Sequence, residues 1–307
     1  MKILIATDKP FAAEAVNGIR NVIEQAGYEL VLLEKYTEKK QLLDAVANIE
    51  AAIIRSDIFD KEVLDAGKNL KIVVRAGAGF DNIDLDAATA NNICVMNTPG
   101  QNANAVAELA LGMAVFAVRN FYNGTSGTEL YGKKLGIHAY GNVGRNVARI
   151  AKGFGMEVYA FDPFLTAEAI EKEGVKAVTS AEELYATCQV VSLHIPATAE
   201  TKNSINYTLL SKMPKNALLI NTARKEVINE AEIVKLMEDR KDFKYVTDIM
   251  PGNHSEMNEK FAGRYFSTPK KTGAQTAEAN TNAGIAAANQ IVDFIKNGNE
   301  RFRVNKK

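Results

Sequence analysis

The chain has 307 residues, which is enough for about two domains of ordinary size. Its 37 basic residues balance its 37 acidic residues, and a net charge of zero argues against a broad nucleic-acid-binding surface. A hydrophobic content of 47% and a charged content of 24% are typical of globular proteins and exclude global disorder.

Short β-branched runs alternate with helical patterns over the first hundred residues. Strands are predicted over residues 2–6, 28–33, 51–56, 71–77 and 93–97, and helices over residues 14–26 and 39–48, with helical turns between the later strands. This alternation is typical of a parallel sheet with right-handed crossover connections.

A long apolar helix is predicted to end near Arg119, and the glycine-containing residues 121–134 are predicted to form an exposed loop. A second series of strands is predicted over residues 135–140, 157–162, 175–178, 190–195, 217–222, 244–249 and 264–269. The last helix, closed by Gly298, has no strand of its own after it and could return to the first lobe. We predict an α/β fold with two parallel-sheet domains, Rossmann-like or flavodoxin-like, and a cleft between them.

Several classes of protein are excluded by simple features. The longest apolar run, residues 109–118, is too short to span a bilayer, and the N-terminus does not resemble a secretory signal. Cys94 and Cys188 lie far apart in apolar runs, which predicts buried thiols. The three histidines have no metal-ligand spacing, so no metal site is expected. A cytoplasmic protein without membrane or nucleic-acid partners is predicted.

Residues 134–155 have the order strand, glycine turn, helix that is typical of a dinucleotide-binding fingerprint. The three glycine positions of the fingerprint are occupied by Ala139, Gly141 and Gly144. A tight turn can tolerate Ala139, Gly141 lets the backbone approach a pyrophosphate, and Gly144 lets the helix pack on the strand.

The cofactor is predicted to be NAD rather than NADP. Its pyrophosphate is expected at the helix N-terminus, near the N–H groups of Asn142 and Val143. Asp162 ends the next strand, 21 residues after Gly141, and a carboxylate there accepts from both ribose hydroxyls and repels a 2′-phosphate. His138 lies inside the first strand of this unit and is predicted to have a packing role.

Four further motifs are VVRAGAGFDNID (73–84), VMNTPGQNANAVAELALG (95–112), VVSLHIPATAETKNSIN (190–206) and MPKNALLINTAR (213–224). They resemble motifs of the D-isomer-specific 2-hydroxyacid dehydrogenases, and within that family of the branch that acts on 3-phospho-D-glycerate. The resemblance covers nearly the whole chain. It implies an NAD domain over residues 99–275 and a discontinuous substrate domain over residues 1–98 and 276–307.

The resemblance also implies an activity and an assembly. The expected reaction is the NAD-dependent oxidation of 3-phospho-D-glycerate, a small phosphorylated 2-hydroxy acid, to 3-phosphohydroxypyruvate, the first step of L-serine biosynthesis. A homodimer formed mainly through the NAD domain is expected. Because the chain ends at Lys307, no C-terminal regulatory domain is expected.

Arg224 matches the arginine that binds the substrate carboxylate and polarises the C2 oxygen in this family. Its chemistry supports that role independently, because a guanidinium is always charged and offers a bidentate fork to an α-oxygen acid. Asp248 matches an aspartate that contacts the nicotinamide carboxamide. The resemblance places the following residues beside the cofactor: His194, Ile195, Pro196, Thr222, Ala223 and Gly273.

Two further arginines point to a phosphate on the substrate. Arg55 and Arg75 end predicted strands and match phosphate-binding arginines of this branch. Pairing of both arginines with surface acids is the alternative that stays open. Other substrate-side positions implied by the resemblance are Ser56, Gly77, Gly79 and Asn102.

The chain departs from the family pattern at two positions. Lys270 stands where the family has a catalytic His, and Asn253 stands where it has a Glu. A lysine must lose its proton to act as a base; the positive charge of Arg224 would favour the neutral amine, a Glu would oppose it, and an Asn would not. Lys270, Asn253 and Arg224 are therefore the predicted catalytic residues, and the chain resembles a short, lysine-bearing subgroup of the branch.

Other assignments stay open. Lys271 could be the functional lysine, and His254 or Glu256 could act as the acid–base group. The alternative activities are those of a hydroxypyruvate or glyoxylate reductase or of another D-2-hydroxyacid dehydrogenase. A further alternative is an NAD-binding regulatory protein of the same fold without catalysis.

Overall fold

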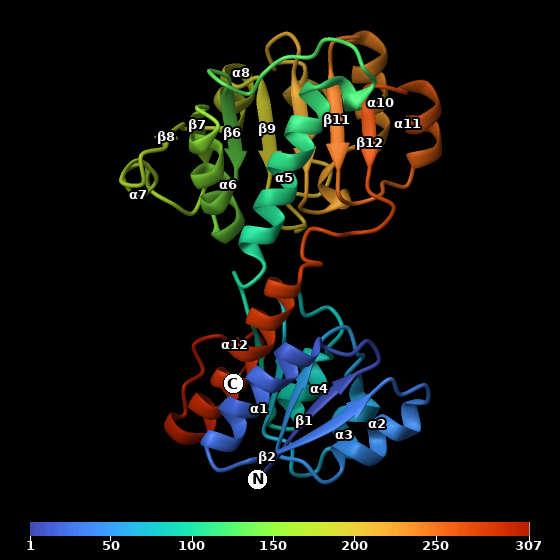
Figure 1. Ribbon diagram of the computed structural model, residues 1–307, viewed down its shortest axis with the longest axis vertical. Helices are drawn as coiled ribbons and strands as arrows, with labels where there is room; N and C mark the ends of the chain where they lie inside the picture. The colour runs from blue at the N-terminus through green and yellow to red at the C-terminus, as the bar shows by residue number, and fades with distance from the viewer. Residues whose placement is uncertain (307) are drawn as a thin grey trace. The chain divides into compact units, whose positions relative to one another are not determined.

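The computed structural model describes residues 1–306 and consists of two compact units (Figure 1). One unit contains Met1–Asn102 and the segment from Gln275 onward, and the other contains Ala103–Ala274. The division therefore falls after Asn102 and after Ala274, and residues 99–102 and Gln275 lie with the first unit. Each unit has one parallel sheet covered by helices on both faces, which confirms the predicted α/β class.

The sheet of the first unit has five strands in the order β2-β1-β3-β4-β5, which is a flavodoxin-like order. The strands are β1 (Lys2–Thr7), β2 (Glu29–Glu34), β3 (Ala51–Ile54), β4 (Ile72–Arg75) and β5 (Cys94–Asn97). Helices α1 (Ala13–Gln25) and α12 (Ala277–Asn297) cover one face. Helices α2 (Lys39–Val46), α3 (Lys61–Ala66) and α4 (Leu85–Ala90) cover the other.

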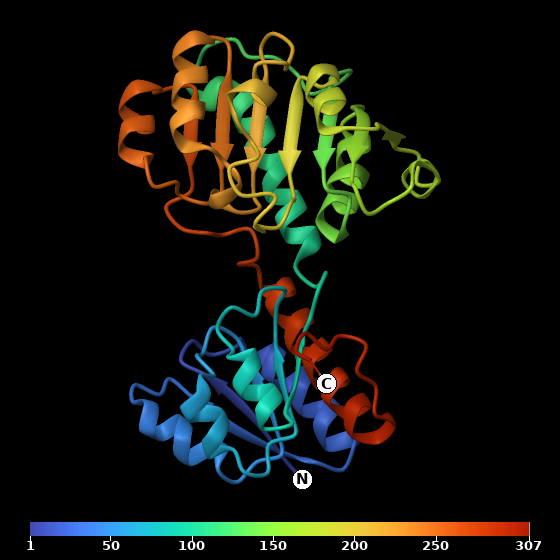
Figure 2. The ribbon, with the colours of Figure 1, turned by 180° about the vertical axis from the view of Figure 1, so that it is seen from behind.

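Helix α12 returns to the first unit and packs along α1 (Figures 1 and 2). Two glycines make this approach close. A Cβ on Gly18 would lie 2.7 Å from Cδ1 of Ile285, and a Cβ on Gly284 would lie 2.8 Å from Cδ1 of Ile19. The helix ends at Gly298 with φ 67°, the left-handed conformation that glycine adopts without strain.

The sheet of the second unit has seven parallel strands in the order β12-β11-β10-β9-β6-β7-β8, the Rossmann order extended by one strand. They are β6 (Lys134–His138), β7 (Glu157–Phe161), β8 (Lys176–Ala177), β9 (Val190–Leu193), β10 (Leu218–Asn221), β11 (Lys244–Thr247) and β12 (Tyr265–Ser267). Helices α5 (Ala103–Val118), α6 (Asn142–Gly153) and α7 (Ala167–Glu171) pack on one core. Helices α8 (Ala181–Thr187), α9 (Tyr207–Leu210), α10 (Glu230–Asp239) and α11 (His254–Lys260) pack on the other.

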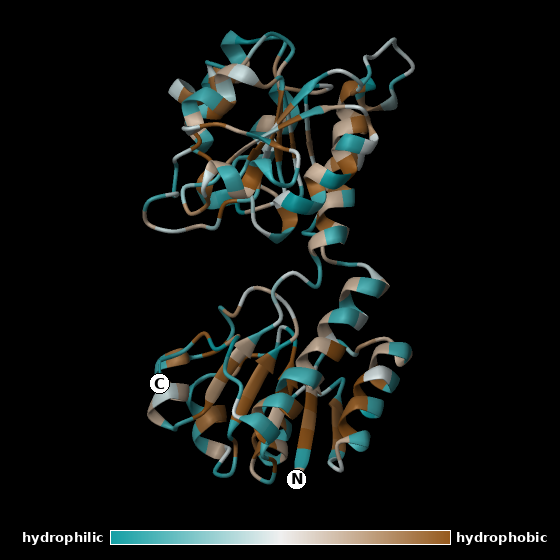
Figure 3. Cartoon of the chain, turned by 90° about the vertical axis from the view of Figure 1, so that its left-hand side faces the viewer, coloured by the Kyte–Doolittle hydropathy of each residue, from teal (hydrophilic) through white to brown (hydrophobic). Residues whose placement is uncertain are grey.

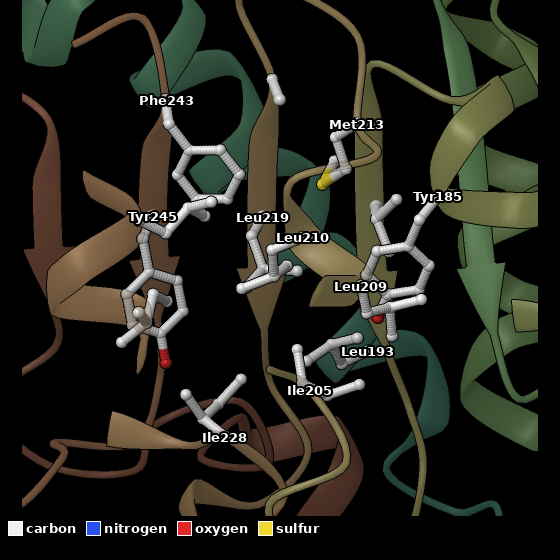
Figure 4. Packing of buried hydrophobic residues seen from close by; sticks show 14 of the residues in the cluster. Tyr185, Leu193, Ile205, Leu209, Leu210, Met213, Leu219, Ile228, Phe243 and Tyr245 are labelled. Carbon is white, nitrogen blue, oxygen red and sulfur yellow. The ribbon is translucent and has the colours of Figure 1, made fainter. Parts of the chain in front are cut away.

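The strands of both sheets are apolar because helices cover both of their faces. Figure 3 shows this as hydrophobic strands between helices that turn hydrophilic residues outward. In the second unit, Leu219 of β10 and Tyr245 of β11 pack with Leu210, Met213 and Phe243 in one of the two cores (Figure 4). No described helix is long and apolar enough to cross a membrane.

His138 has the packing role predicted for it. It is 8% exposed, and its Nδ1 lies 3.2 Å from the hydroxyl oxygen of Tyr185. Its ring also packs against Phe161 and Tyr185. Burial lowers the pKa of His138 to about 4, so the ring is neutral at physiological pH.

The segment after α5 differs from the predicted exposed loop at its start and near its end. It begins with a left-handed turn, η1 (Asn120–Tyr122), in which three consecutive residues have φ between 51° and 56°. Lys244 stabilises this turn, because its Nζ donates to the Ala117 carbonyl at 2.8 Å and to Oδ1 of Asn120 at 2.7 Å. Leu130, later in the segment, is buried in the core.

The strand expected over residues 175–178 is shorter in the structure and contains only Lys176–Ala177.

Candidate active site

The chemically distinctive residues of the second unit follow the carboxyl ends of its strands. Because all seven strands are parallel, these ends meet at one edge of the sheet, as the arrowheads of β6, β9, β11 and β12 show in Figure 1. The glycine turn follows β6 and His194 follows β9, on either side of the point where the strand order reverses. Ligands of doubly wound α/β proteins bind at this kind of point.

The glycine turn after β6 has the tight geometry that the fingerprint requires. Ala139 has φ 77°, so this alanine adopts a conformation that favours glycine. A Cβ on Gly144 would lie 2.5 Å from the carbonyl oxygen of Ala139, which explains why only glycine fits there. Gly141, by contrast, faces open space: a Cβ there would meet nothing within 4 Å.

Asp162 follows β7, and its carboxylate stabilises the glycine turn after β6 through a hydrogen bond. Its Oδ2 accepts from the backbone N–H of Tyr140 at 2.8 Å, and its Oδ1 accepts from the N–H of Phe164 at 2.9 Å. The carboxylate is half-buried, so part of it faces the outside of the turn. Each oxygen has lone-pair capacity left for a ribose hydroxyl.

Two observations show that this edge fits a dinucleotide. The open space over Gly141 and the exposed N-terminus of α6 leave room for a pyrophosphate on the N–H groups near Asn142 and Val143. Thr222, after β10, is 5% exposed, and its buried Oγ1 has no hydrogen-bond partner within the described residues. A buried hydroxyl without a partner costs free energy, which a ligand at this edge would recover.

The remaining cofactor-side residues predicted from the sequence lie at the same edge. His194 is half-buried, and its Nε2 lies 3.0 Å from the hydroxyl oxygen of Ser192. Ile195 is buried and Pro196 is exposed. Ala223 is buried, and its N–H donates to Oδ1 of Asn221 at 3.0 Å.

Arg224 is presented by a short turn that Asn221 organises. Asn221 is fully buried; besides accepting from Ala223, it donates from Nδ2 to the carbonyl of Arg224 at 2.9 Å. The Arg224 guanidinium is half-buried, and its only recorded hydrogen bond within residues 1–306 runs from Nη1 to the Ala223 carbonyl at 2.8 Å. Most of its donors are therefore available to an anion.

Asp248, after β11, is fully buried and has partners that the sequence did not reveal. Its carboxylate accepts four hydrogen bonds from the segment 268–273, which follows β12. Lys270 lies on that segment, and its side chain is exposed, with no hydrogen bond or ion pair recorded within residues 1–306. Gly273 is buried beside Asp248.

Asn253 does not contact Lys270 through any hydrogen bond recorded within the described chain. Its Nδ2 donates to the backbone carbonyl of Glu230 at 3.0 Å, while its buried Oδ1 has no partner among the described residues. His254 lies 2.9 Å, through Nδ1, from the hydroxyl oxygen of Tyr265. Burial raises the pKa of Tyr265, so its hydroxyl stays protonated and available to this histidine.

The first unit brings Arg55 and Arg75 together at the carboxyl edge of its own sheet. Nε of Arg75 donates to the backbone carbonyl of Arg55 at 3.0 Å, and the guanidinium of Arg75 lies against Gly77, where a Cβ would collide with it. Gly77 has φ 152°, which also favours glycine. Ser56 is exposed, and Gly79 and Asn102 are half-exposed.

The Arg55 guanidinium is already held by neutral groups. Its Nη1 donates to the carbonyls of Lys9 at 3.1 Å and Pro10 at 3.3 Å, and its Nη2 donates to Oδ1 of Asn280 at 2.7 Å. It also lies over the ring of Phe11. These partners are carbonyl and amide oxygens rather than the surface acids of the alternative interpretation.

The sequence analysis did not identify three residues that position the site: Asn221, which organises the Arg224 turn, and Thr268 and Thr272, which donate to Asp248. The available signals were a polar residue ending an otherwise apolar strand and a threonine on each side of the lysine pair. Within residues 1–306, no group of three or more His, Cys, Asp or Glu residues is placed to hold a metal ion.

Comparisons with known proteins identify the family and support the fold. Residues 101–269 match the family described as D-isomer specific 2-hydroxyacid dehydrogenase, NAD binding domain. A crystal structure of NAD⁺-bound 3-phosphoglycerate dehydrogenase from Entamoeba histolytica is 48% identical in sequence, with a TM-score of 0.87. The match covers 100% of this chain and 99% of that one.

Two curated proteins show the range of names among the relatives. D-3-phosphoglycerate dehydrogenase of Haemophilus influenzae is 34% identical over 241 residues, which cover 73% of this chain and 58% of that protein. Hydroxypyruvate reductase of Thermotoga maritima is 32% identical over 286 residues, which cover 86% of this chain and 90% of that protein. The chain thus spans little more than half of the curated phosphoglycerate dehydrogenase that it matches.

Proposed function

The chain belongs to the D-isomer specific 2-hydroxyacid dehydrogenase family, and we propose that it oxidises 3-phospho-D-glycerate to 3-phosphohydroxypyruvate with NAD. This reaction would be the first step toward L-serine. The observation that carries the substrate assignment is the arginine pair at the carboxyl edge of the first unit. Arg75 donates there to the backbone carbonyl of Arg55, and the recorded hydrogen bonds of the Arg55 guanidinium run to carbonyl and amide oxygens.

The proposed phosphate contact follows from the state of these two side chains. A guanidinium has five N–H donors, and the three hydrogen bonds of Arg55 leave two of them unused. The guanidinium of Arg55 is hydrogen-bonded to neutral oxygens, and the carboxylates of Asp8 and Asp57 act on its charge without a recorded hydrogen bond to it. A fixed cation with spare donors suits a dianionic phosphate.

The chemistry itself is proposed for residues of the second unit. The Arg224 guanidinium binds the substrate carboxylate and polarises the C2 oxygen. The neutral amine of Lys270 accepts the proton of the C2 hydroxyl while the C2–H bond breaks, and the carbonyl forms. NAD bound at this site would supply the acceptor for the hydride that leaves C2. In the reverse direction the Lys270 ammonium returns the proton to the oxygen.

The residues proposed to hold NAD are those at the carboxyl edge of the second sheet. The N–H groups near Asn142 and Val143 hold the pyrophosphate, Asp162 accepts from the ribose hydroxyls, and Thr222 supplies a free hydroxyl. Asn253 is proposed to line the site without charge, leaving no carboxylate at its position to hold a proton on Lys270.

Replacing Asp162 by Ala is expected to narrow the preference for NAD over NADP. The parent carboxylate repels a 2′-phosphate, and the Ala variant does not. The measurement is kcat/KM with each cofactor. Asp239→Ala, on the exposed side of α10, is the matched control and should leave the preference unchanged. Equal kcat/KM for both cofactors in the parent would contradict this role of Asp162.

Replacing Arg55 or Arg75 by Ala is expected to raise KM for 3-phosphoglycerate by more than tenfold and to change KM for glycerate much less. Only the phosphorylated substrate loses a charge-assisted contact, typically worth about 1.5–3 kcal/mol. Steady-state kinetics with both substrates checks this, with Arg20→Ala on α1 as the control. An equal effect on both substrates would show that the arginines are structural.

A hydroxypyruvate reductase is the second candidate function. The match to the Thermotoga maritima protein, which covers 90% of that protein, favours it. Hydroxypyruvate carries no phosphate, so this activity would leave Arg55 and Arg75 without a role. The Arg55 and Arg75 variants therefore discriminate between the two candidates.

We further propose that the chain forms a homodimer through the second unit. From Leu109 to its end, helix α5 has no polar side chain, yet Gly112 is exposed and the ring of Phe116 is only half-buried beside Tyr122, which is 66% exposed. Such a helix is normally buried all round. Sedimentation should give twice the 33.4 kDa of the chain, and Gly112→Glu should give the monomer mass. A parent that sediments as a monomer would contradict the proposal.

A further inference from the structure

We propose that Asp248 is a positioning residue whose buried carboxylate clamps the two ends of the segment 268–273 and thereby places Lys270. The clamp is a feature of the second unit alone. Its meaning for the reaction rests on the proposed function, because it assumes that Lys270 is the acid–base group.

The hydrogen bonds of Asp248 reach both ends of the segment but not its apex. At the start, Oγ1 of Thr268 donates to Oδ1 at 2.9 Å. At the end, the backbone N–H and Oγ1 of Thr272 donate to the same oxygen at 2.8 and 2.6 Å, and the N–H of Gly273 donates to Oδ2 at 2.8 Å. Lys270 lies between these anchors, on an exposed apex.

The charge of Asp248 makes this clamp strong. The side chain is fully buried, and a buried carboxylate is stable only when donors compensate for the water it has lost. Four donors do so here, all of them neutral N–H or O–H groups from the segment. Hydrogen bonds to an ionised acceptor are stronger than neutral ones, so opening the segment would leave a buried charge unpaired.

At Gly273 the backbone of the segment lies close to the Asp248 carboxylate. A Cβ on Gly273 would lie 3.0 Å from Oδ2 of Asp248 and 3.3 Å from Cγ2 of Val106. Any other residue at this position would push the segment away from the carboxylate. One carboxylate, that of Asp248, therefore explains why the segment has a threonine at position 268 and a threonine followed by a glycine at positions 272 and 273.

The clamp gives Asp248 a role that differs from the nicotinamide contact implied by family resemblance. Oδ1 already has three donors, whereas Oδ2 has one and retains capacity for another. Replacing Asp248 itself would disturb both roles. The threonine hydroxyls donate only to Oδ1, so their removal tests the clamp alone.

The experiment compares the Thr268→Val/Thr272→Val double variant with Thr268→Ser/Thr272→Ser. The Val pair removes two donors but keeps the shape of the side chains, while the Ser pair keeps both hydroxyls. Trypsin cleavage after Lys270 or Lys271, followed by mass spectrometry, reports opening of the segment. Thermal unfolding monitored by circular dichroism shows that each variant is folded.

We expect the Val pair to be cleaved at this lysine pair on the order of tenfold faster than the parent, because the segment opens locally more often. Its kcat should fall by at least about tenfold with NAD affinity nearly unchanged, because two charge-assisted hydrogen bonds are lost and each is typically worth about that factor. The Ser pair should behave like the parent in both measurements.

Unchanged cleavage of the folded Val pair would overturn the clamp. Faster cleavage with unchanged kcat would overturn its role in placing Lys270. Absence of activity in the parent would contradict the proposed function, but the cleavage rates would still test the clamp. If the Val pair is unfolded, Gly273→Ala replaces it, because the added Cβ presses on Oδ2 from the other end of the clamp and should give the same faster cleavage.

Discussion

Replacing Lys270 by Ala is expected to lower kcat for 3-phosphoglycerate oxidation by about 10²–10⁴-fold, the usual contribution of one general acid–base group. The variant has no amine to accept the C2 hydroxyl proton. NAD affinity should stay nearly unchanged, because most of the proposed cofactor-side residues follow β6, β7, β9 and β10, and the Lys270 side chain has no hydrogen bond recorded within residues 1–306 to the two that lie elsewhere, Asp248 and Gly273. Stopped-flow turnover and a fluorescence titration with NADH measure the two quantities.

Two variants control this experiment. Lys271→Ala, at the neighbouring exposed lysine, should have a mild effect. Lys270→Arg should be almost as damaging as Ala, because a guanidinium does not deprotonate in the working pH range. A Lys270→Ala protein with near-parental kcat would refute the assignment, and the acid–base role would then pass to Lys271 or His254.

Replacing Arg224 by Ala is expected to lower kcat/KM for the hydroxy acid by about 10²–10³-fold, because the substrate carboxylate loses a charged bidentate partner. The fold should tolerate the change, since the side chain makes one recorded hydrogen bond, to its neighbour Ala223. Arg224→Lys should lose much of the same activity, because an ammonium keeps the charge but not the fork.

The matched control for Arg224 is Lys225→Ala, at the next residue, which is exposed in η2 (Lys225–Val227). It removes a positive charge from the same turn without removing the fork, so kcat/KM should change little. If both variants lower kcat/KM equally, the effect is that of overall charge and Arg224 has no specific contact with the carboxylate.

The fold and the cofactor edge could be predicted from sequence because their signals are local. Alternating apolar runs and helical patterns predicted the two parallel sheets. The spacing of Gly141, Gly144 and Asp162 predicted the nucleotide turn, and the structure shows the physical reason: the Gly144 position leaves no room for a Cβ. Arg224 could be proposed from the sequence because it follows a buried strand at the edge of the sheet where ligands of such folds bind.

The partners of Asp248 could not be predicted, because they are set by tertiary structure. Its hydrogen-bond donors lie 20 to 25 residues further along the chain and follow a different strand. They meet only because β11 and β12 are neighbours in the sheet. The sequence supplied the threonines and the lysines but gave no indication of a common acceptor.

The left-handed turn after α5 was missed for a different reason. Three consecutive residues other than glycine rarely adopt positive φ, because each one costs about 1–2 kcal/mol. Here Lys244, more than a hundred residues further along, compensates by bonding to Asn120 and to the end of the helix. Local propensity therefore pointed to an irregular loop where tertiary contacts stabilise a defined turn.

The measurement that tests the account most directly is kcat/KM with NAD for 3-phospho-D-glycerate, compared with D-glycerate, D-lactate and 2-hydroxyglutarate under the same conditions. The proposed function predicts that 3-phosphoglycerate exceeds glycerate by orders of magnitude, because the phosphate is the group that Arg55 and Arg75 would bind in a desolvated site. Similar values for the phosphorylated and unphosphorylated substrates, or no oxidation of 3-phosphoglycerate, would contradict it.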